Sequence, residues 1–413
     1  MPQGGDPTTV DVNAQCAGLE YHYVYITACT FIVFLILPGI AFLYSGLTRR
    51  KSALALLFQG FMILAVTTFQ WLFWGYSLAY SRNGGPFIGT LENFGLMNVM
   101  VAPSPGSAVL PDVVFCLFQL LFCACTVMIV VGGAFERGSI LPSLIFSFFW
   151  ATIVYCPLAR WTWSSNGWLY KFEAIDFAGG GPRMHHGEHS LRKPHNTTLV
   201  FLGTVLVWTG WLGFNGGSSL NASMRAMVAI FNTNTAGCMG ILGGHCRSRG
   251  NHPSGVGCVS LWLAACIGFI TGIVCSALQN INGWMRIDEG MAVFKLHGIG
   301  GMVGAFLTGL FASESISALD GATLTGGAID GNGIQVGRQL AEICAIARYS
   351  FVVSYILLVI FKYFPGMHLR VDEESEMMGL DQAQFFDEQI GDWSIANGMD
   401  SLMLMGVSEV PPS

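Results

Sequence analysis

The stretch "DVVFCLFQLLFCACTVMIVVGGA", residues Asp112 to Ala134, is apolar except for the acid at its start, Gln119 and Thr126. A helix needs roughly 20 such residues to cross a hydrocarbon layer about 30 Å thick, so this stretch predicts a membrane-spanning helix. The same reasoning applied outward along the chain predicts eight further spans, at 23–47, 53–80, 140–162, 197–217, 224–244, 258–281, 292–312 and 338–364.

The composition supports this interpretation. The 413 residues are 53% hydrophobic and 11% charged, with a mean hydropathy of +0.55. A soluble domain usually carries about 25% charged residues. We therefore expect an all-α polytopic membrane protein with nine full spans. A tenth, partial span is predicted at 167–184, where Lys171, Glu173 and Asp176 interrupt the apolar run.

Basic residues in short loops predict the orientation of the spans. The loop "TRRKS", Thr48 to Ser52, joins the first two spans and is expected in the cytoplasm, so residues 1–22 form an extracellular segment. The transmembrane domain is expected over 23–364. Residues 365–413 carry ten acids against one arginine and predict an acidic cytoplasmic tail, in which "MMGLDQAQFFDEQ" could form a short docking helix.

Several function classes lack support in the sequence. The twelve cysteines lie mostly in apolar runs, without paired CxxC units, and no basic patch indicates nucleic-acid binding. The sequence contains neither a nucleophile with a partner base nor a phosphate-binding loop, so it gives no indication of an enzyme. We predict no cofactor and no metal, although a site built from His185, His186, His189 and His195 has acceptable ligand spacing.

Polar and aromatic residues inside spans are candidates for function because a polar group in lipid is costly. Trp163, Phe122 and Phe214 could form an aromatic cage for a small cation, to which Ser218 could offer a hydrogen-bond acceptor. His297 opens a glycine-rich span, "FKLHGIGGMVGAFLTGLF", Phe294 to Phe311. For each aromatic pair, lipid-facing or core packing is the competing interpretation, and for the histidine it is a satisfied core position.

Nine motifs in order resemble the ammonium transporter family (Amt/Mep/Rh), most closely its fungal plasma-membrane branch. They are "GLTRRKS", "WGYSLAYS", "GGAFERG", "DFAGGG", "KPHNTTLVFLGTVLVW", "GWLGFNGGSS", "FNTN", "RIDEGM" and "FKLHGIGG". The resemblance runs from about Tyr25 into the acidic tail. It implies eleven helices with two inverted five-helix halves, a homotrimer in the plasma membrane, and ammonium or ammonia as substrate, with methylammonium as a further candidate.

The resemblance also implies roles for individual residues. Trp163, Phe122 and Ser218 match the outer cation-recruiting site, which Asp176 supports from beneath. Phe122 and Phe214 match a pair of stacked phenylalanines that gate the pore. The match places His297 as the second of two pore histidines, and it places Phe118 and Trp211 along the pore.

The sequence departs from the family pattern at three places. In "DFAGGGPRMHHGEHS", Asp176 to Ser190, the first pore histidine should follow the aspartate by eight residues, which is Met184; His185 lies one residue further. The stretch "HCRSRGNHPSGVGCVS", His245 to Ser260, is too short for the seventh helix's end and the eighth helix. Ala292 stands where the family usually has aspartate.

These departures predict a truncated fifth helix and truncated seventh and eighth helices. Unless 167–184 crosses the membrane, the spans 197–217 and 224–244 would then be inverted, which would carry Phe214 and Ser218 away from Trp163. An alternative function follows from the same departures: a non-transporting subunit or ammonium sensor that assembles with full-length transporters.

Overall fold

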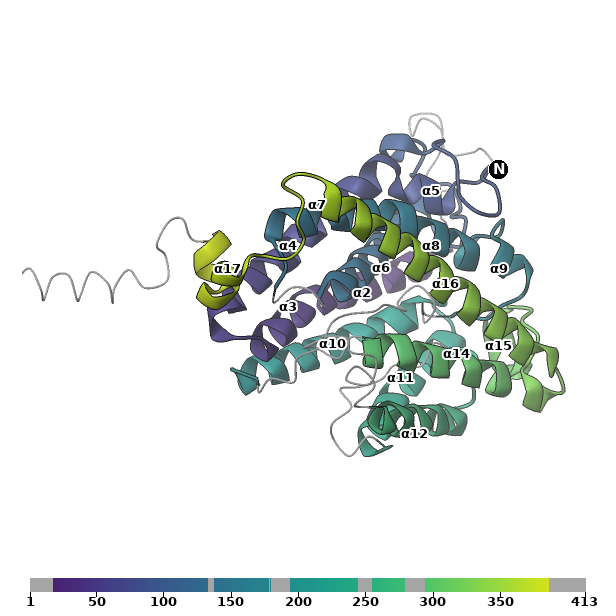
Figure 1. Ribbon diagram of the computed structural model, residues 1–413. Helices are drawn as coiled ribbons and strands as arrows, with labels where there is room; N and C mark the ends of the chain where they lie inside the picture. Colours follow the sequence, from purple (N-terminus) through teal and green to yellow (C-terminus); the bar gives the residue numbers. More distant parts are fainter. Residues whose placement is uncertain are drawn as a thin grey trace, which may run out of the picture.

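The computed structural model describes residues 18–132, 137–177, 179, 194–243, 255–278 and 294–385. Within these ranges the chain is nearly all helical, and its only β-pairing is two isolated bridges. The helices lie side by side as one bundle (Figure 1). In chain order the elements are α2 (Glu20–Phe34), α3 (Ile36–Leu47), α4 (Ala53–Gln70), a π turn (Trp71–Gly75), α5 (Tyr76–Tyr80), α6 (Asp112–Gly132), α7 (Ile140–Trp150), a π turn (Ala151–Tyr155), α8 (Cys156–Trp163), α9 (Trp168–Lys171), α10 (Thr197–Gly217), α11 (Met224–Gly243), α12 (Leu261–Ala277), a π turn (Phe294–Ile299), α14 (Gly300–Phe311), α15 (Glu314–Ser317), α16 (Ile334–Tyr363), α17 (Glu373–Met378) and a π turn (Asp381–Phe385).

All nine predicted spans coincide with helices. Seven helical stretches in the described ranges are long and apolar enough to cross a membrane, and α14 with α15 forms a further candidate that bends by 101°. The remaining run, α12, has 17 residues. The predicted partial span at 167–184 is not helical where it is described, apart from the four residues of α9, because the polar residues from Lys171 onward end the apolar run.

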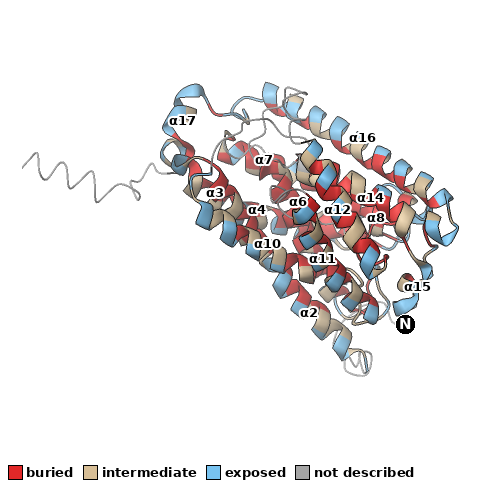
Figure 2. Ribbon diagram, turned by 90° about the horizontal axis from the view of Figure 1, so that it is seen from below, coloured by how far each residue is buried: buried red, intermediate tan, exposed pale blue. Residues whose placement is uncertain are grey.

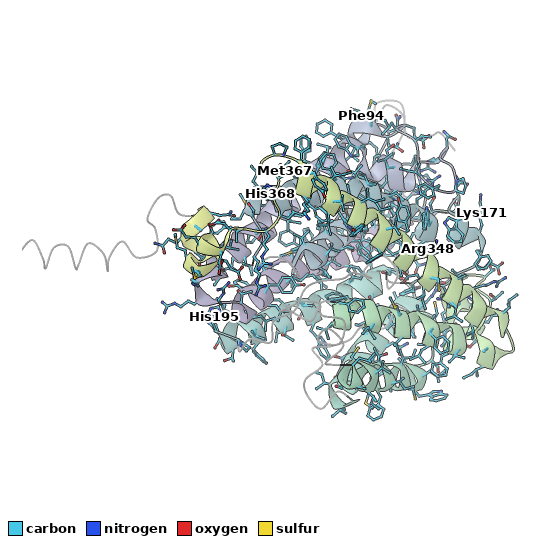
Figure 3. All side chains as sticks on the ribbon, viewed as in Figure 1. Phe94, Lys171, His195, Arg348, Met367 and His368 are labelled. Atoms are coloured by element: carbon cyan, nitrogen blue, oxygen red, sulfur yellow. The ribbon has the colours of Figure 1, made fainter. Side chains whose placement is uncertain are left out.

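The bundle has two ends, which we name after Trp163 and Thr48. At the Trp163 end, Trp161 donates a hydrogen bond to the Phe87 carbonyl, joining α8 to the loop after α5. At the Thr48 end, the chain turns from α3 into α4. Figure 1 places α9 and α15 at the Trp163 end and α17 at the other, and Figure 3 labels Lys171 and His195 at these opposite ends.

The described residues that flank the first departure from the family pattern lie at these two ends. On one side of it, the Asp176 carbonyl accepts a hydrogen bond from Trp163 Nε1 (3.0 Å). On the other side, His195 Nδ1 lies 2.9 Å from the Thr48 carbonyl, and the Asn196 amide donates to Gly46. Helix α10 therefore begins at the Thr48 end and ends at the Trp163 end. The inversion of 197–244, expected only if 167–184 does not cross the membrane, does not occur.

The described residues on the two sides of the second departure also lie toward opposite ends of the bundle. Helices α11 and α12 lie side by side and run in the same direction, with the backbone of Ala236 against Gly268 and that of Gly240 against Gly272. The Val259 carbonyl near the start of α12 accepts from Asn232 on α11. Two consecutive parallel helices require the chain to return between them, so the described residues that flank this departure, 243 and 255, lie toward opposite ends of α11.

Glycines let α10 pack closely against α2 and α3. A Cβ on Gly203 would overlap the backbone of Leu43, and one on Gly46 would lie 2.8 Å from the Val200 nitrogen. In lipid the hydrophobic effect does not drive helices together, so close van der Waals packing between backbones stabilises the contact instead. This contact runs antiparallel, from Gly46 near the start of α10 to Cys29 beside Gly213, and it brings the end of α10 to the Trp163 end.

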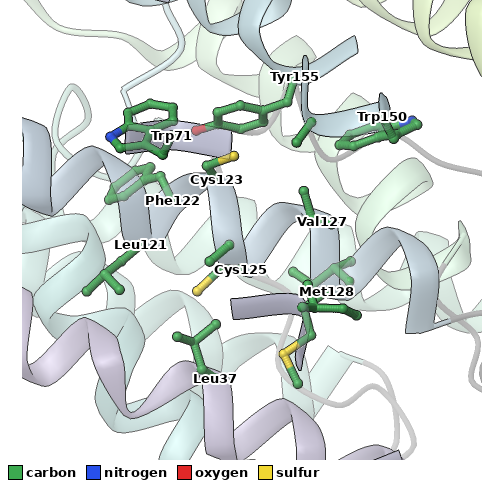
Figure 4. Packing of buried hydrophobic residues seen from close by; sticks show 14 of the residues in the cluster. Leu37, Trp71, Leu121, Phe122, Cys123, Cys125, Val127, Met128, Trp150 and Tyr155 are labelled. Atoms are coloured by element: carbon green, nitrogen blue, oxygen red, sulfur yellow. The ribbon is translucent and has the colours of Figure 1, made fainter. Parts of the chain in front are cut away.

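The core lies around α6, whose side chains are buried along most of its length (Figure 2). Trp71 and Tyr155, from the π turns that follow α4 and α7, pack near Cys123 on one face of α6, and Leu37 lies on another (Figure 4). The Trp71 indole N–H donates to the Cys116 carbonyl (3.2 Å). The core thus fixes the position of Phe122 on the same helix.

The start of the acidic tail docks on the Thr48 end. Asp381 accepts hydrogen bonds from the amides of Leu54 (3.2 Å) and Ala55 (2.7 Å), at the start of α4. Glu376 on α17 forms an ion pair with Arg137 (2.9 Å). An acid at a helix N-terminus is favourable because it satisfies unpaired N–H groups and opposes the helix dipole. The described part of the predicted docking helix, residues 377–385, comprises the end of α17 and a short π turn that begins at Asp381; residues 386–389 lie outside the described ranges.

Candidate functional site

A pocket of about 380 Å³ opens at the Trp163 end. Its walls come from the loop before α6, α6 itself, the end of α8, the segment after α9, the α10–α11 turn and the loops that precede α12 and follow α15. Four sequence-predicted residues line it: Trp163, Phe122, Ser218 and Asp176. The fold therefore brings together side chains from helices that are far apart in the sequence.

The aromatic part of the pocket is built from α6 and α8. The rings of Phe122 and Trp163 meet edge to face, with centroids 6.1 Å apart and an interplanar angle of 89°. Trp163 ends α8, and its indole N–H donates to the carbonyl of Asp176. This bond fixes the indole and ties the segment after α9 to the pocket wall, so a ring face can be presented to a bound cation.

The polar part comes from Ser218 and Asp176. Ser218 Oγ donates to the Phe214 carbonyl (2.8 Å), which turns its lone pairs away from that bond and makes it an acceptor for a ligand. Asp176 Oδ1 accepts from the Gly179 amide (2.8 Å), and the Asp176 residue is 8% exposed. A buried carboxylate with a fixed position favours a cation nearby.

Below the pocket, aromatic rings form a series toward His297. Phe122 and Phe214 are stacked, with centroids 3.5 Å apart and a 20° angle. Trp211 follows 5.8 Å from Phe214, and its ring lies 6.4 Å from the His297 imidazole at an angle of 23°. The structure therefore places four predicted residues, from three different helical segments, in one continuous line. Apolar rings at this spacing leave no room for a hydrated ion.

Two predicted pore residues, Phe118 and His297, differ in burial. Phe118 is fully buried and packs 4.9 Å from Phe122; a Cβ on Gly217 would lie 2.6 Å from its ring, so a glycine is required there. His297 lies in the π turn before α14 and is half-buried. A π turn inserts an extra residue into a helix, and such insertions often lie at functional positions. His185 lies outside the described residues.

Sequence reasoning missed a polar ladder on α16 that holds the Asp176 segment. Gln339 accepts from the Ile175 amide (2.7 Å) and donates to the Ile175 carbonyl (2.9 Å) and to Glu342 (2.9 Å). Gln335 donates to the Glu173 carbonyl (2.9 Å). Glu342 is 1% exposed. An acid inside an apolar span was the signal that could have found this ladder.

A buried ion pair at the pocket was also missed. Arg225 begins α11 and pairs with Asp320 at 3.2 Å, and both residues line the pocket. The arginine at the start of the predicted span 224–244 was the available signal. Among the described residues, no three His, Cys, Asp or Glu side chains are arranged to hold a metal ion.

The fold and this site define a polytopic helical membrane protein with an aromatic and polar pocket at one end. The sequence model of the Ammonium Transporter Family matches residues 24–253 and 251–390, and the chain belongs to this family. The two matched pieces meet at 251–253, within the second departure from the family pattern.

Individual relatives agree with this assignment. The chain is 41% identical to ammonium transporter 1 of Schizosaccharomyces pombe, over 92% of this chain and 84% of the relative. It is 39% identical to the ammonium transporter MEP2 of Saccharomyces cerevisiae, over 92% and 85%. The crystal structure of Candida albicans Mep2 superposes with a TM-score of 0.84 at 37% identity, covering 91% of each chain.

Proposed function

We propose that this chain transports ammonium across the plasma membrane, by recruiting NH4+ at the Trp163 pocket and passing NH3 along the aromatic line to His297. One arrangement carries the proposal: a pocket with ring faces, a hydroxyl acceptor and a buried carboxylate lies directly above two stacked phenylalanines. The relatives named as ammonium transporters support the choice of substrate.

Recruitment follows from the electrostatics of the pocket. The faces of Trp163 and Phe122 attract a small cation through their quadrupoles, an interaction of about 0.5–2 kcal/mol that increases with desolvation. Ser218 accepts one N–H of the cation, and the Asp176 carboxylate stabilises its positive charge. Methylammonium presents the same charge and N–H groups, so we include it as a second substrate.

Passage requires that the cation lose its charge. An isolated ion in an apolar passage is strongly disfavoured, whereas a neutral molecule crosses at a much smaller cost. The cation releases a proton to water or to the Asp176 carboxylate, NH4+ → NH3 + H+. The Phe122 and Phe214 rings are in contact, so NH3 passes them only when the rings move apart. Below them, Trp211 and His297 line the path, on which the imidazole offers a hydrogen-bonding partner. K+ has no proton to release and is excluded.

The proposal also includes the orientation of the chain in the plasma membrane and its assembly. Arg49, Arg50 and Lys51 lie at the Thr48 end, so we assign this end to the cytoplasm and the Trp163 end to the outside. The N-terminal residues 1–22 are then extracellular, 23–364 span the membrane and 365–413 form a cytoplasmic tail. Exposed apolar side chains such as Phe31, Phe201 and Tyr355 contact lipid or a neighbouring copy in a homotrimer.

The test is uptake of labelled methylammonium, and growth on low ammonium, in yeast cells that lack their own ammonium transporters. We expect the chain to support both, and Asp176→Asn to abolish both at equal surface abundance. The matched control is Glu173→Gln, three residues earlier on the same segment, whose side chain is 55% exposed and pairs with Arg338. This control should behave as wild type.

Two further measurements separate the alternatives. A chain that reaches the plasma membrane as a trimer, shown by cross-linking, but supports no uptake would refute transport and favour a non-transporting subunit or sensor. In liposomes, His297→Glu should admit ions that the wild type excludes. Unchanged selectivity in that variant would remove the imidazole from the path.

A further inference from the structure

The pocket contains one basic side chain that the transport scheme does not use. Arg225 Nη1 lies 3.2 and 3.3 Å from the two Asp320 oxygens, and its Nε donates to the Gly257 carbonyl (2.7 Å). Its Nη2 lies 3.1 Å from Cys258 Sγ, and its guanidinium carbon lies 4.9 Å from the centroid of the Phe177 ring.

Both partners of this pair are almost completely removed from water. The side chains of Arg225 and Asp320 are 7% and 4% exposed. A buried charge whose partner is removed acts over a long distance, because little water screens it. A change in either residue therefore alters the electric potential inside the pocket.

Three charged side chains line the described part of the pocket. Asp176, Asp320 and Arg225 are the only ionisable acids and bases among its described lining residues, apart from cysteine and tyrosine. Two acids against one arginine leave one net negative charge, which matches a single monovalent cation. Asp320 neutralises Arg225, so the net charge corresponds to Asp176.

We propose that the Arg225–Asp320 pair sets the charge of the cation pocket, so that its affinity for a monovalent cation depends on both members with opposite signs. This inference rests on the proposed function. Without Asp320, the arginine is left unpaired and repels the cation. Without Arg225, the pocket carries a second negative charge, binds cations more tightly and loses discrimination against K+.

A purely structural role of the Arg225–Asp320 pair predicts a different result. The guanidinium joins the α11 start, the turn before α12 and the loop after α15, so it could simply hold the mouth together. In that case loss of either partner should damage the pocket in the same direction. The sign of the change in KM therefore distinguishes a charge-setting pair from a structural clamp.

The experiment measures methylammonium uptake in yeast lacking its own transporters, with surface protein quantified. A unit charge left unpaired roughly 10 Å from the cation, at an effective dielectric of about 20, changes affinity on the order of tenfold. We expect Asp320→Asn to raise KM by this factor, Arg225→Gln to lower it and make uptake sensitive to K+, and the double variant to return close to wild type.

Two controls accompany these variants. Glu314→Gln removes an exposed acid from the same outer loop that does not line the pocket, and KM should not change. Arg225→Lys keeps the charge but not the forked geometry. If Asp320→Asn does not accumulate, Arg225→Lys still decides: a near wild-type KM supports the proposal, and a change as large as that of Arg225→Gln contradicts it.

The outcomes are distinct. Parallel KM shifts in the two single variants, or a double variant no better than either, would overturn the charge-setting role while leaving transport intact. Absence of uptake by the unaltered chain would instead refute the proposed function, and this inference with it.

Discussion

Replacement of Gln339 by leucine tests how the Asp176 segment is held. Gln339 is fully buried, and its side chain makes four hydrogen bonds: two with the backbone of Ile175, one from Gln335 and one to Glu342. Leucine has a similar size and is apolar, so it fills the space but pairs with none of these groups. The segment that carries Asp176 then loses both bonds with Gln339 and keeps, on α16, the contacts of Glu173 with Gln335 and Arg338.

The expected magnitude follows from these bonds. Only the two bonds to Ile175 join the segment to α16, and each contributes about 0.5–1.5 kcal/mol net, so together they contribute about 2 kcal/mol to the docked state. A factor of ten corresponds to about 1.4 kcal/mol, so the segment should open roughly 30-fold more often. We expect a loss of methylammonium uptake at equal surface abundance, because Asp176 no longer stays beside Trp163.

Hydrogen–deuterium exchange of the detergent-solubilised protein, read on peptides that contain Ile175, measures this opening. Arg338→Ala is the control: it removes a neighbouring residue on the same helix whose ion pair with Glu173 is largely exposed, which contributes about 1 kcal/mol or less. If Gln339→Leu exchanges and transports like this control, the ladder does not hold the segment and the reasoning is refuted.

Three further predictions concern the gate, the packing and the tail. Phe214→Ala removes a ring stacked on Phe122, so liposomes should leak K+ and the protein should lose about 3–5 kcal/mol of stability; a tight, selective variant would contradict the gate. Gly203→Val should lower the melting temperature in detergent, because its side chain overlaps the Leu43 backbone, and an unchanged melting temperature would show that α10 and α3 can separate without cost. Asp381→Ala removes a cap from α4 worth about 1–2 kcal/mol, so limited proteolysis should cleave the tail faster than in wild type; equal rates would contradict docking.

The membrane helices could be predicted because their signal is local. Each of the nine apolar runs became a helix, since roughly 20 apolar residues in lipid must satisfy their backbone groups internally. The pocket residues Trp163, Phe122, Ser218 and Asp176 were also predicted, through the motifs that carry them. The structure brings them to one cavity; their roles remain proposals.

The direction of α10 and α11 could not be predicted in the same way. Counting spans implied inversion, because no apolar run of membrane length fills either departure from the family pattern. Contacts outside those departures decided it instead, with Asn196 held at Gly46 and Phe214 stacked on Phe122. Glycine packing of α10 against α2 and α3 selects a single orientation, and hydropathy contains no information about packing.

By itself, the sequence determined that this chain belongs in a membrane, where its spans lie and which motifs relate it to a family, because the transfer of each segment into lipid depends on that segment's own side chains. Only the tertiary structure decided which distant groups meet. Arg225 reaches Asp320 across 95 residues, and Gln339 reaches Ile175 across 164. Such pairs depend on how helices pack, and packing is a property of the assembled bundle rather than of any one stretch.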